Sequence, residues 1–304
     1  MLYWVSHPDY DIPLPAGHRF AASKFSDLMQ HLQQHGLADH ARIITPDPVG
    51  HDALARVHDR GYIAAVADGT LDAPAQRVLG LPWSQALARR SFLAPSGTLL
   101  AACKALRHGL ACHVAGGTHH AHHGHGAGFC VFNDLAYAAT AVLDAGAAGR
   151  VLILDCDVHQ GDGTARILAD EPAVFTCSLH GARNYPVRKA ESDLDVPLQA
   201  GLDSPGYLAV LAETLQQLEK LFRPDLVLYD AGVDIHLDDA LGQLAVDDAG
   251  LRARDSMVLD HFLGRSIPVA TVIGGGYSHD RQQLSWRHSQ VFRAAISAWD
   301  RWLR

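Results

Sequence analysis

Short apolar runs that alternate with helical patterns are the feature of this sequence that most restricts its fold. The runs are rich in β-branched residues and read CHVAGGT (112–118), RVLILDCD (150–157), AVFTCSLH (173–180), DLVLYDAGVD (225–234) and PVATVIGGG (268–276). Continuous apolar runs of this kind are typical of strands that are buried on both faces of a parallel sheet.

Three stretches between and after these runs place apolar residues at helical spacing. They are the alanine-rich stretch 133–148, the stretch 206–222 with five large apolar residues on one face, and the closing stretch 284–303. The alternation of strand and helix predicts an α/β fold with a mostly parallel central sheet and helices on both faces, in three layers α/β/α. The sequence has no repeat and no long Pro/Gly/Ser-rich linker, so we expect a single domain over residues 1–304.

Charge and cysteine content exclude several classes of partner. The formal net charge is −8 and no block of lysine and arginine occurs, so we expect neither a nucleic-acid nor a membrane partner. No apolar run approaches the ~20 residues that a membrane-spanning helix needs, and the stretch MLYWVSHPDYD has no signal-peptide pattern. Five cysteines without a CxxC pair are typical of reduced thiols. We therefore expect a cytoplasmic protein.

Polar, ionisable residues follow four of the apolar runs, where each predicted strand ends. HHAHH follows the first run, DVHQGDG the second, DIHLDD the fourth and Tyr277 the fifth. Ligands of open parallel sheets bind beyond the carboxyl ends of the strands. The four strand ends therefore predict one functional site.

The motif LDCDVHQGDG (154–163) contains Asp155, Asp157 and His159 at alternate positions, so their side chains point to one side of an extended chain. Burial of these side chains at a strand end is costly unless a cation compensates them. A divalent metal would do so, and a polar loop that caps the following helix is the alternative interpretation.

The motif DAGVDIHLDDALG (230–242) adds further carboxylates. A catalytic zinc takes three protein ligands and keeps an open position, and we choose Asp239 as the third. Asp234 is a possible oxygen donor, whereas we interpret Asp238 as part of an acidic surface turn.

Five histidines fall between positions 119 and 125. Adjacent side chains point in different directions, so His119 and His120 could not easily share one ion. They could face one substrate as a general base and an electrostatic partner if each is held by its own carboxylate. His122, His123 and His125 lie in a glycine-rich loop, where we expect solvated surface residues.

The motif IGGGYSHD (273–280) places Tyr277 after three glycines, which let the backbone turn sharply and approach a ligand closely. An ordinary packing tyrosine beside a glycine loop is the alternative interpretation.

Taken together, these motifs resemble the zinc-dependent histone deacetylase family, including its bacterial acetoin-utilisation and acetylpolyamine amidohydrolase relatives. GGTHHA, GFCVFND, LDCDVHQGDGT, SLH, AGVDIHLDDALG and GGGY occur in the family's order between residues 116 and 277, and GHRFAASKF and RVHDRGYI extend the resemblance towards the amino terminus. The chain looks most like short bacterial class IV-type members. The resemblance implies the arginase/deacetylase-like form of the α/β/α fold.

The resemblance also implies roles for individual residues. The implied zinc ligands are Asp157, His159 and Asp239, with Fe²⁺ as an alternative metal in vivo. The implied catalytic residues are His120 as general base and acid, His119 as its electrostatic partner, Asp155 and Asp162 as the carboxylates that orient His119 and His120, and Tyr277 as the hydrogen-bond donor to the oxyanion. A structural K⁺ would lie at Asp155, Asp157, His159, Ser178 and Leu179. Gly128, Phe129 and Tyr185 would form walls of the acyl-lysine channel.

The implied activity is removal of acyl groups, acetyl or longer, from lysine side chains of proteins. An acylated small amine such as an acetylpolyamine is the alternative substrate, and a non-catalytic acyl-lysine- or metal-binding module is a further alternative. Two positions depart from the family's pattern: Gln160 replaces a second histidine, and Thr118 stands where a bulkier residue is common. Both leave the acyl preference open, and nothing in the sequence indicates an oligomeric state.

Overall fold

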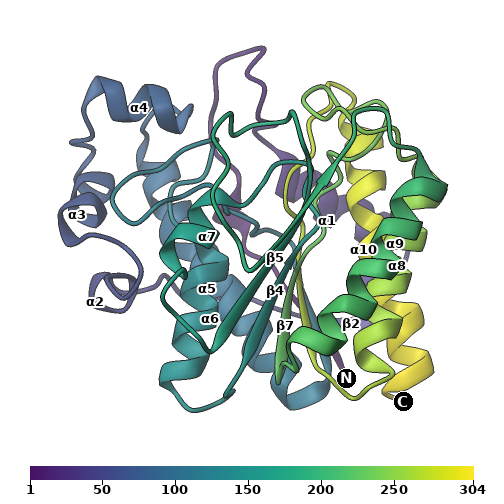
Figure 1. Ribbon diagram of the computed structural model, residues 1–304. Coiled ribbons are helices and arrows are strands. Elements are labelled where there is room, and N and C mark those ends of the chain that lie inside the picture. Colours follow the sequence, from purple (N-terminus) through teal and green to yellow (C-terminus); the bar gives the residue numbers. More distant parts are fainter.

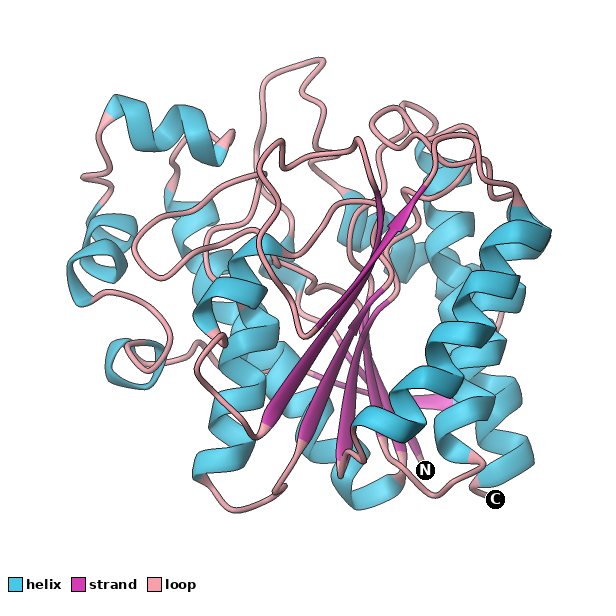
Figure 2. Cartoon of the chain, in the orientation of Figure 1, coloured by secondary structure: helices cyan, strands magenta, loops and turns pink.

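The computed structural model describes residues 1–304 and contains one eight-stranded sheet (Figures 1 and 2). Its strands are β1 (Leu2–Val5), β2 (Ala41–Ile44), β3 (Leu110–His113), β4 (Val151–Asp155), β5 (Val174–Gly181), β6 (Leu194–Leu198), β7 (Leu226–Asp230) and β8 (Val269–Val272). Every pair is parallel, and the order is β2-β1-β3-β8-β7-β4-β5-β6. The predicted parallel α/β fold is confirmed.

Ten α-helices surround the sheet. They are α1 (Lys24–Gln34), α2 (His51–Leu54), α3 (Arg60–Asp68), α4 (Ala73–Leu79), α5 (Gln85–His108), α6 (Asp134–Asp144), α7 (Asp162–Ile167), α8 (Ser204–Leu221), α9 (Asp248–Leu263) and α10 (Arg281–Trp302). Helices α5 and α6 cover one face of the sheet and α8, α9 and α10 the other, which completes the three layers (Figure 1). None of the helices is long and apolar enough to cross a membrane.

The five predicted strands correspond to β3, β4, β5, β7 and β8, which are almost wholly buried. The sequence did not reveal β1, β2 or β6. Strands β2 and β6 lie at the two edges of the sheet, and most of their residues are at least partly exposed. Edge strands lack the continuous apolar run of a strand that is buried on both faces.

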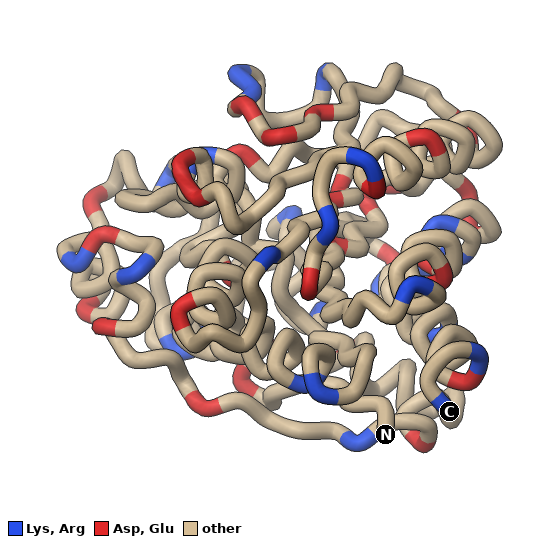
Figure 3. Tube along the Cα trace, turned by 60° about the horizontal axis from the view of Figure 1, so that its bottom comes forward, with Lys and Arg blue, Asp and Glu red and all other residues tan.

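The carboxyl ends of the strands form the edge of the sheet where the long loops gather, at the top of Figure 2. Strand register aligns the residues that end the central strands, since Asp155 of β4 pairs with Ser178 of β5 and with Asp230 of β7. Positive and negative residues are interspersed along the chain in Figure 3. The polar motifs of the sequence therefore meet at one edge of the sheet, in a molecule whose formal net charge is −8.

Candidate active site

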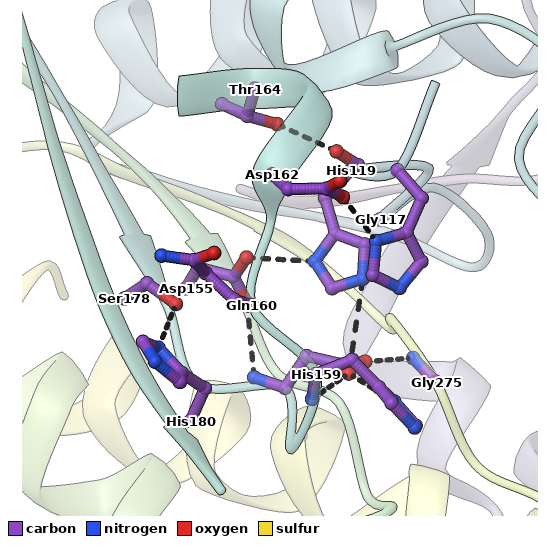
Figure 4. Close-up of polar contacts among 12 residues, drawn as sticks. Gly117, His119, Asp155, His159, Gln160, Asp162, Thr164, Ser178, His180 and Gly275 are labelled. Carbon is purple, nitrogen blue, oxygen red and sulfur yellow. Dashed lines mark hydrogen bonds and ion pairs between the residues drawn. The ribbon is translucent and has the colours of Figure 1, made fainter. Parts of the chain in front are cut away.

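Two adjacent histidines in the loop that follows β3 are each paired with a carboxylate from another element; Figure 4 labels His119, Asp155 and Asp162. Nδ1 of His119 donates to Oδ2 of Asp155 at 2.7 Å, and Nδ1 of His120 donates to Oδ1 of Asp162 at 2.8 Å. The two imidazole rings are 4.1 Å apart between centroids and tilted by 52°. Each histidine thus has its own carboxylate, as the sequence predicted, because Asp155 ends β4 and Asp162 begins α7.

The two histidines have opposite pKa shifts although both are buried. Burial disfavours the charged form of His119, but the charges of Asp155 and Asp157 outweigh it and raise its pKa well above the ordinary value. Burial lowers the pKa of His120 to about 3, and the charge of His119 adds to the effect. The surroundings therefore favour the protonated form of His119 and the neutral form of His120. Neighbouring titratable groups with diverging pKa values are typical of acid–base catalysis.

Beside the histidines, Asp157, His159 and Asp234 bring one potential ligand atom each within 4.8 Å of the others. Nδ1 of His159 lies 3.1 Å from Oδ1 of Asp157 and 3.0 Å from Oδ2 of Asp234. All three residues are buried. Burial, with the charge of Asp157 next in importance, raises the pKa of Asp234 to about 7. Two buried carboxylates and an imidazole at these distances fit a divalent cation, which would relieve the repulsion between the carboxylates.

Asp239 is next to this group but outside it. Its Oδ2 accepts a hydrogen bond from the backbone N–H of Tyr277 at 2.7 Å, and its Oδ1 accepts from Leu241 and Gly242 at 2.9 and 3.0 Å. The N–H of Gly275 donates to Oδ2 of Asp157 at 2.7 Å. The glycine turn after β8 therefore holds both Asp157 and Asp239. Asp234, and not Asp239, supplies the third potential ligand atom of the group that contains Asp157 and His159.

Steric contacts explain why the turn after β8 consists of glycines. A Cβ atom on Gly275 would lie 2.1 Å from Oδ2 of Asp234 and 2.5 Å from Oδ2 of Asp157. These distances are far below van der Waals contact, so a side chain at position 275 would displace both carboxylates. The turn also sets the position of Tyr277, whose pKa burial raises well above its ordinary value. Its hydroxyl is therefore a neutral hydrogen-bond donor.

Comparison with known proteins agrees with this geometry. A family model described as the histone deacetylase domain matches residues 18–293. The chain belongs to the histone deacetylase family. It is 48% identical over 291 residues, 96% of this chain and 97% of the relative, to an uncharacterized protein of Picosynechococcus sp.. It is 29% identical over 269 residues to histone deacetylase 2 of Arabidopsis thaliana, with 86% of this chain and 70% of that protein covered.

A match over part of the chain and a structural match agree with this family. The acetoin utilization protein AcuC of Staphylococcus aureus is 35% identical over 145 residues, which cover 44% of this chain and 37% of AcuC. The crystal structure of the HDA15 HD domain superposes with a TM-score of 0.81 at 23% identity, over 97% of this chain and 88% of that one. This structural match supports the histone deacetylase fold.

An open cavity of about 380 Å³ leads from the surface of this deacetylase-family chain to His120 and Tyr277. Among its lining residues are Gly128, Phe129 and Tyr185, the three predicted channel residues, together with His120 and Tyr277. The ring of Tyr185 stands edge-on to His120 at 4.8 Å. A Cβ on Gly128, which has φ +53°, would lie 2.6 Å from the ring of His120. Only glycine leaves room for the histidine at this point.

The residues predicted for potassium also meet in the deacetylase-family fold. Ser178 is paired with Asp155 across β4 and β5, and Leu179 is the next residue of β5. The Oγ of Ser178 lies 3.0 Å from Nδ1 of His180 (Figure 4). Gln160, which replaces a second histidine of the family's pattern, is hydrogen-bonded to Asp195: its Nε2 donates to Oδ1 of Asp195 at 2.7 Å.

One expectation about the histidine run is wrong. His122 is not a solvated loop residue, because it is only 8% exposed and its Nε2 lies 3.2 Å from Oδ2 of Asp162. His123 and His125 are exposed as expected, and the ring of His125 stacks on His122 at 4.5 Å. The local sequence did not reveal the contact because it depends on Asp162, forty residues further along the chain.

Sequence reasoning also missed two charged residues that lie next to the site. Asp230 is fully buried, and neither of its carboxylate oxygens has a hydrogen-bond partner. Burial, followed by the charge of Asp155, raises its pKa well above the ordinary value. Lys24 is 5% exposed and its Nζ donates to the carbonyl of Gly274 at 2.6 Å. Lys24 lies within the motif GHRFAASKF, but that motif gave no sign that the lysine side chain reaches the turn after β8.

Proposed function

We propose that this histone deacetylase-family hydrolase is a metal-dependent deacylase of acyl-lysine side chains in proteins. The observation that carries the proposal is the pair of adjacent histidines, each held by its own buried carboxylate, beside a buried group of cation-binding atoms. A binding module would need the cation-binding group or the cavity, but not two histidines held side by side in this way.

The proposed metal ligands are Asp157, His159 and Asp239, with Asp234 holding His159. The backbone hydrogen bonds of the glycine turn to Asp157 and Asp239 support this set. When bound, a divalent cation such as Zn²⁺ or Fe²⁺ supplies a Lewis acid for the amide carbonyl and lowers the pKa of the attacking water. We also propose a K⁺ at Asp155, Ser178 and the neighbouring backbone carbonyls.

The protein's own side chains then handle the protons. His120 is neutral, and its Nδ1 is occupied by Asp162, so its Nε2 is free to accept a proton from water. The same nitrogen returns the proton to the amine as the amide bond breaks. His119 remains protonated and stabilises negative charge on the reacting carbonyl. Tyr277 donates a hydrogen bond to the same oxygen, a contribution of about 3 kcal/mol.

The walls of the cavity support a substrate with a long aliphatic arm. Phe129 and the half-exposed Tyr185 flank the entrance to His120, and such rings suit the methylene chain of a lysine. The second candidate substrate is an acylated small amine, which would enter the same cavity without contacting the protein surface around it. The partial match to AcuC keeps this candidate open.

A kinetic panel tests the proposal. Metal-loaded protein is assayed with acetyl-lysine peptides of several sequences, with the single amino acid acetyl-lysine, and with acetylputrescine and acetylspermidine. A kcat/KM at least tenfold higher for the peptides supports a protein substrate. Higher values for the acetylpolyamines would favour the second candidate, and no hydrolysis of any of them would contradict the deacylase proposal itself.

A further inference from the structure

A second, smaller cavity adjoins the same residues. It is lined by His119, His120, Asp157 and Tyr277, and also by Phe20, Phe25, Lys24 and Arg90. The volume open to the centres of water molecules in it is about 30 Å³, against about 380 Å³ in the first cavity. An acyl group whose carbonyl is at the catalytic residues would extend its far end into this cavity.

Arg90 is a buried cation that contacts aromatic rings but has no anionic partner. It projects from α5, it is 6% exposed, and its Nε has no hydrogen-bond partner. The guanidinium carbon lies 4.6 Å from the ring centre of Phe25 and 5.1 Å from that of Phe20. Burial lowers its pKa to about 10, so it stays charged at neutral pH. A buried charge that lacks an anionic partner is destabilising, so such charges normally mark a ligand or an ion pair.

The protein supplies no anion for Arg90. Asp11 and Asp134 influence it only through space. Both oxygens of Asp134 are already occupied, by Thr98 and Gly117 on one side and by Thr118 on the other. The thiol of Cys130, which also lines the cavity, is neutral because burial raises its pKa to about 12.

Lys24, the other cation of the cavity, is different. Burial lowers its pKa to about 8, while the charges of Asp234 and Asp157 oppose that shift. Its ammonium group is also held by the carbonyl of Gly274. Lys24 is therefore balanced by the cation-binding group of the active site, and Arg90 is left as the anion-binding side chain.

We propose that Arg90 binds the distal carboxylate of a short dicarboxylic acyl group, such as malonyl or succinyl, and makes the enzyme selective for lysines that carry it. This inference rests on the proposed deacylase function. The planar guanidinium matches a carboxylate with two parallel hydrogen bonds. The small volume and charged lining exclude long hydrocarbon chains. The reaction is hydrolysis: one water is consumed, the C–N bond breaks, and the dicarboxylate and the lysine amine are released.

The test compares kcat/KM for succinyl-, malonyl- and acetyl-lysine versions of one peptide. The wild type is expected to prefer a dicarboxylic acyl group over acetyl, and Arg90→Gln is expected to lower the succinyl-to-acetyl ratio about 10- to 100-fold, the effect of one charge-assisted hydrogen-bonded pair. Arg89→Gln is the matched control, because the exposed Arg89 is the preceding residue of α5 and pairs with Asp9 at the surface. It should leave the ratio unchanged.

Two further measurements keep the outcome decisive. Arg90→Lys keeps the charge but loses the planar geometry, so it should give an intermediate succinyl-to-acetyl ratio. If Arg90→Gln does not fold, Arg90→Lys replaces it in the test. Titration of the metal-loaded protein with succinate, acetate and neutral succinamide measures binding without turnover, and succinate should bind at least tenfold more weakly to Arg90→Gln.

Three results would overturn the assignment of Arg90 as the carboxylate-binding residue. They are a wild-type protein that prefers acetyl-lysine, a succinyl-to-acetyl ratio that Arg90→Gln does not change, and a wild-type protein that binds acetate as tightly as succinate. Failure of the deacylase proposal is distinguishable from these. A protein that hydrolyses none of the peptides refutes the deacylase function, and the succinate titration then still decides whether Arg90 binds a carboxylate.

Discussion

Replacement of Asp162 by asparagine tests the proposed proton transfer most directly. The Asp162 carboxylate accepts a hydrogen bond from His120 at 2.8 Å and lies 3.2 Å from His122. When His120 takes a proton in the transition state, this carboxylate faces a new positive charge. A charge-assisted hydrogen bond contributes about 1.5–3 kcal/mol, which corresponds to roughly 10- to 150-fold in rate. The amide of asparagine can also present its NH₂ group to Nδ1 and favour the wrong tautomer.

We therefore expect Asp162→Asn to lower kcat for an acetyl-lysine peptide by about 10²-fold, with KM and metal content close to wild type. The assay is steady-state kinetics with metal analysis of the same preparation. Asp170→Asn, an exposed carboxylate after the end of α7, is the control and should behave as wild type. His122→Ala should lose only a few-fold, because His122 contacts Asp162 and not the substrate. A kcat for Asp162→Asn within threefold of wild type, with metal retained, would refute the assignment of His120 as the base.

Three other predictions concern the metal, the oxyanion and pH. Asp239→Ala should lose bound Zn²⁺ almost completely and Asp234→Ala only in part, as measured by metal analysis after dialysis. A greater loss of Zn²⁺ from Asp234→Ala than from Asp239→Ala would make Asp234 the ligand. Tyr277→Phe should keep its metal and lose about 10²- to 10³-fold in kcat, the effect of one oxyanion donor, and near-normal turnover would contradict that role. His58 is buried, and burial lowers its pKa to about 4, below the ~6.5 of the unfolded chain. The unfolded state therefore takes up a proton on His58 at a higher pH than the folded state does. The free energy of unfolding keeps its full value above pH 6.5 and falls as the pH drops towards 4, by up to about 3 kcal/mol. Urea unfolding at pH 7 and pH 4.5 should show this loss, and His58→Gln should reduce it.

The central strands were predictable because burial on both faces leaves a continuous apolar run in the sequence. Helix α9 was not predicted, and its buried face explains why: it contains Arg254 and Asp255, which form a fully buried ion pair at 2.9 Å. A buried pair of opposite charges interrupts an apolar stripe without weakening the packing. The edge strands β2 and β6 were missed because one side of each is exposed, so neither has a continuous apolar run.

Within the site, the residues alone suggested that each histidine needs its own carboxylate, and only the family resemblance implied which ones. Asp155 ends β4 and Asp162 begins α7, and the structure places them beside His119 and His120. The position of His122 does not follow from the order of the elements, because it depends on the second oxygen of Asp162. Arg90 lies in a helix that no motif marked, and its surroundings come from residues about seventy positions earlier in the chain.

The strand order has a consequence for synthesis of the chain. Strand β8 is the last strand to be made, yet it lies in the middle of the sheet, between β3 and β7. The glycine turn and Tyr277 follow it directly. Until this segment leaves the ribosome, the histidines on the β3 side and the carboxylates on the β7 side have no strand to join them. These two groups therefore cannot be held beside each other before β8 has been made, and a chain that ends before residue 269 lacks a central strand of its sheet.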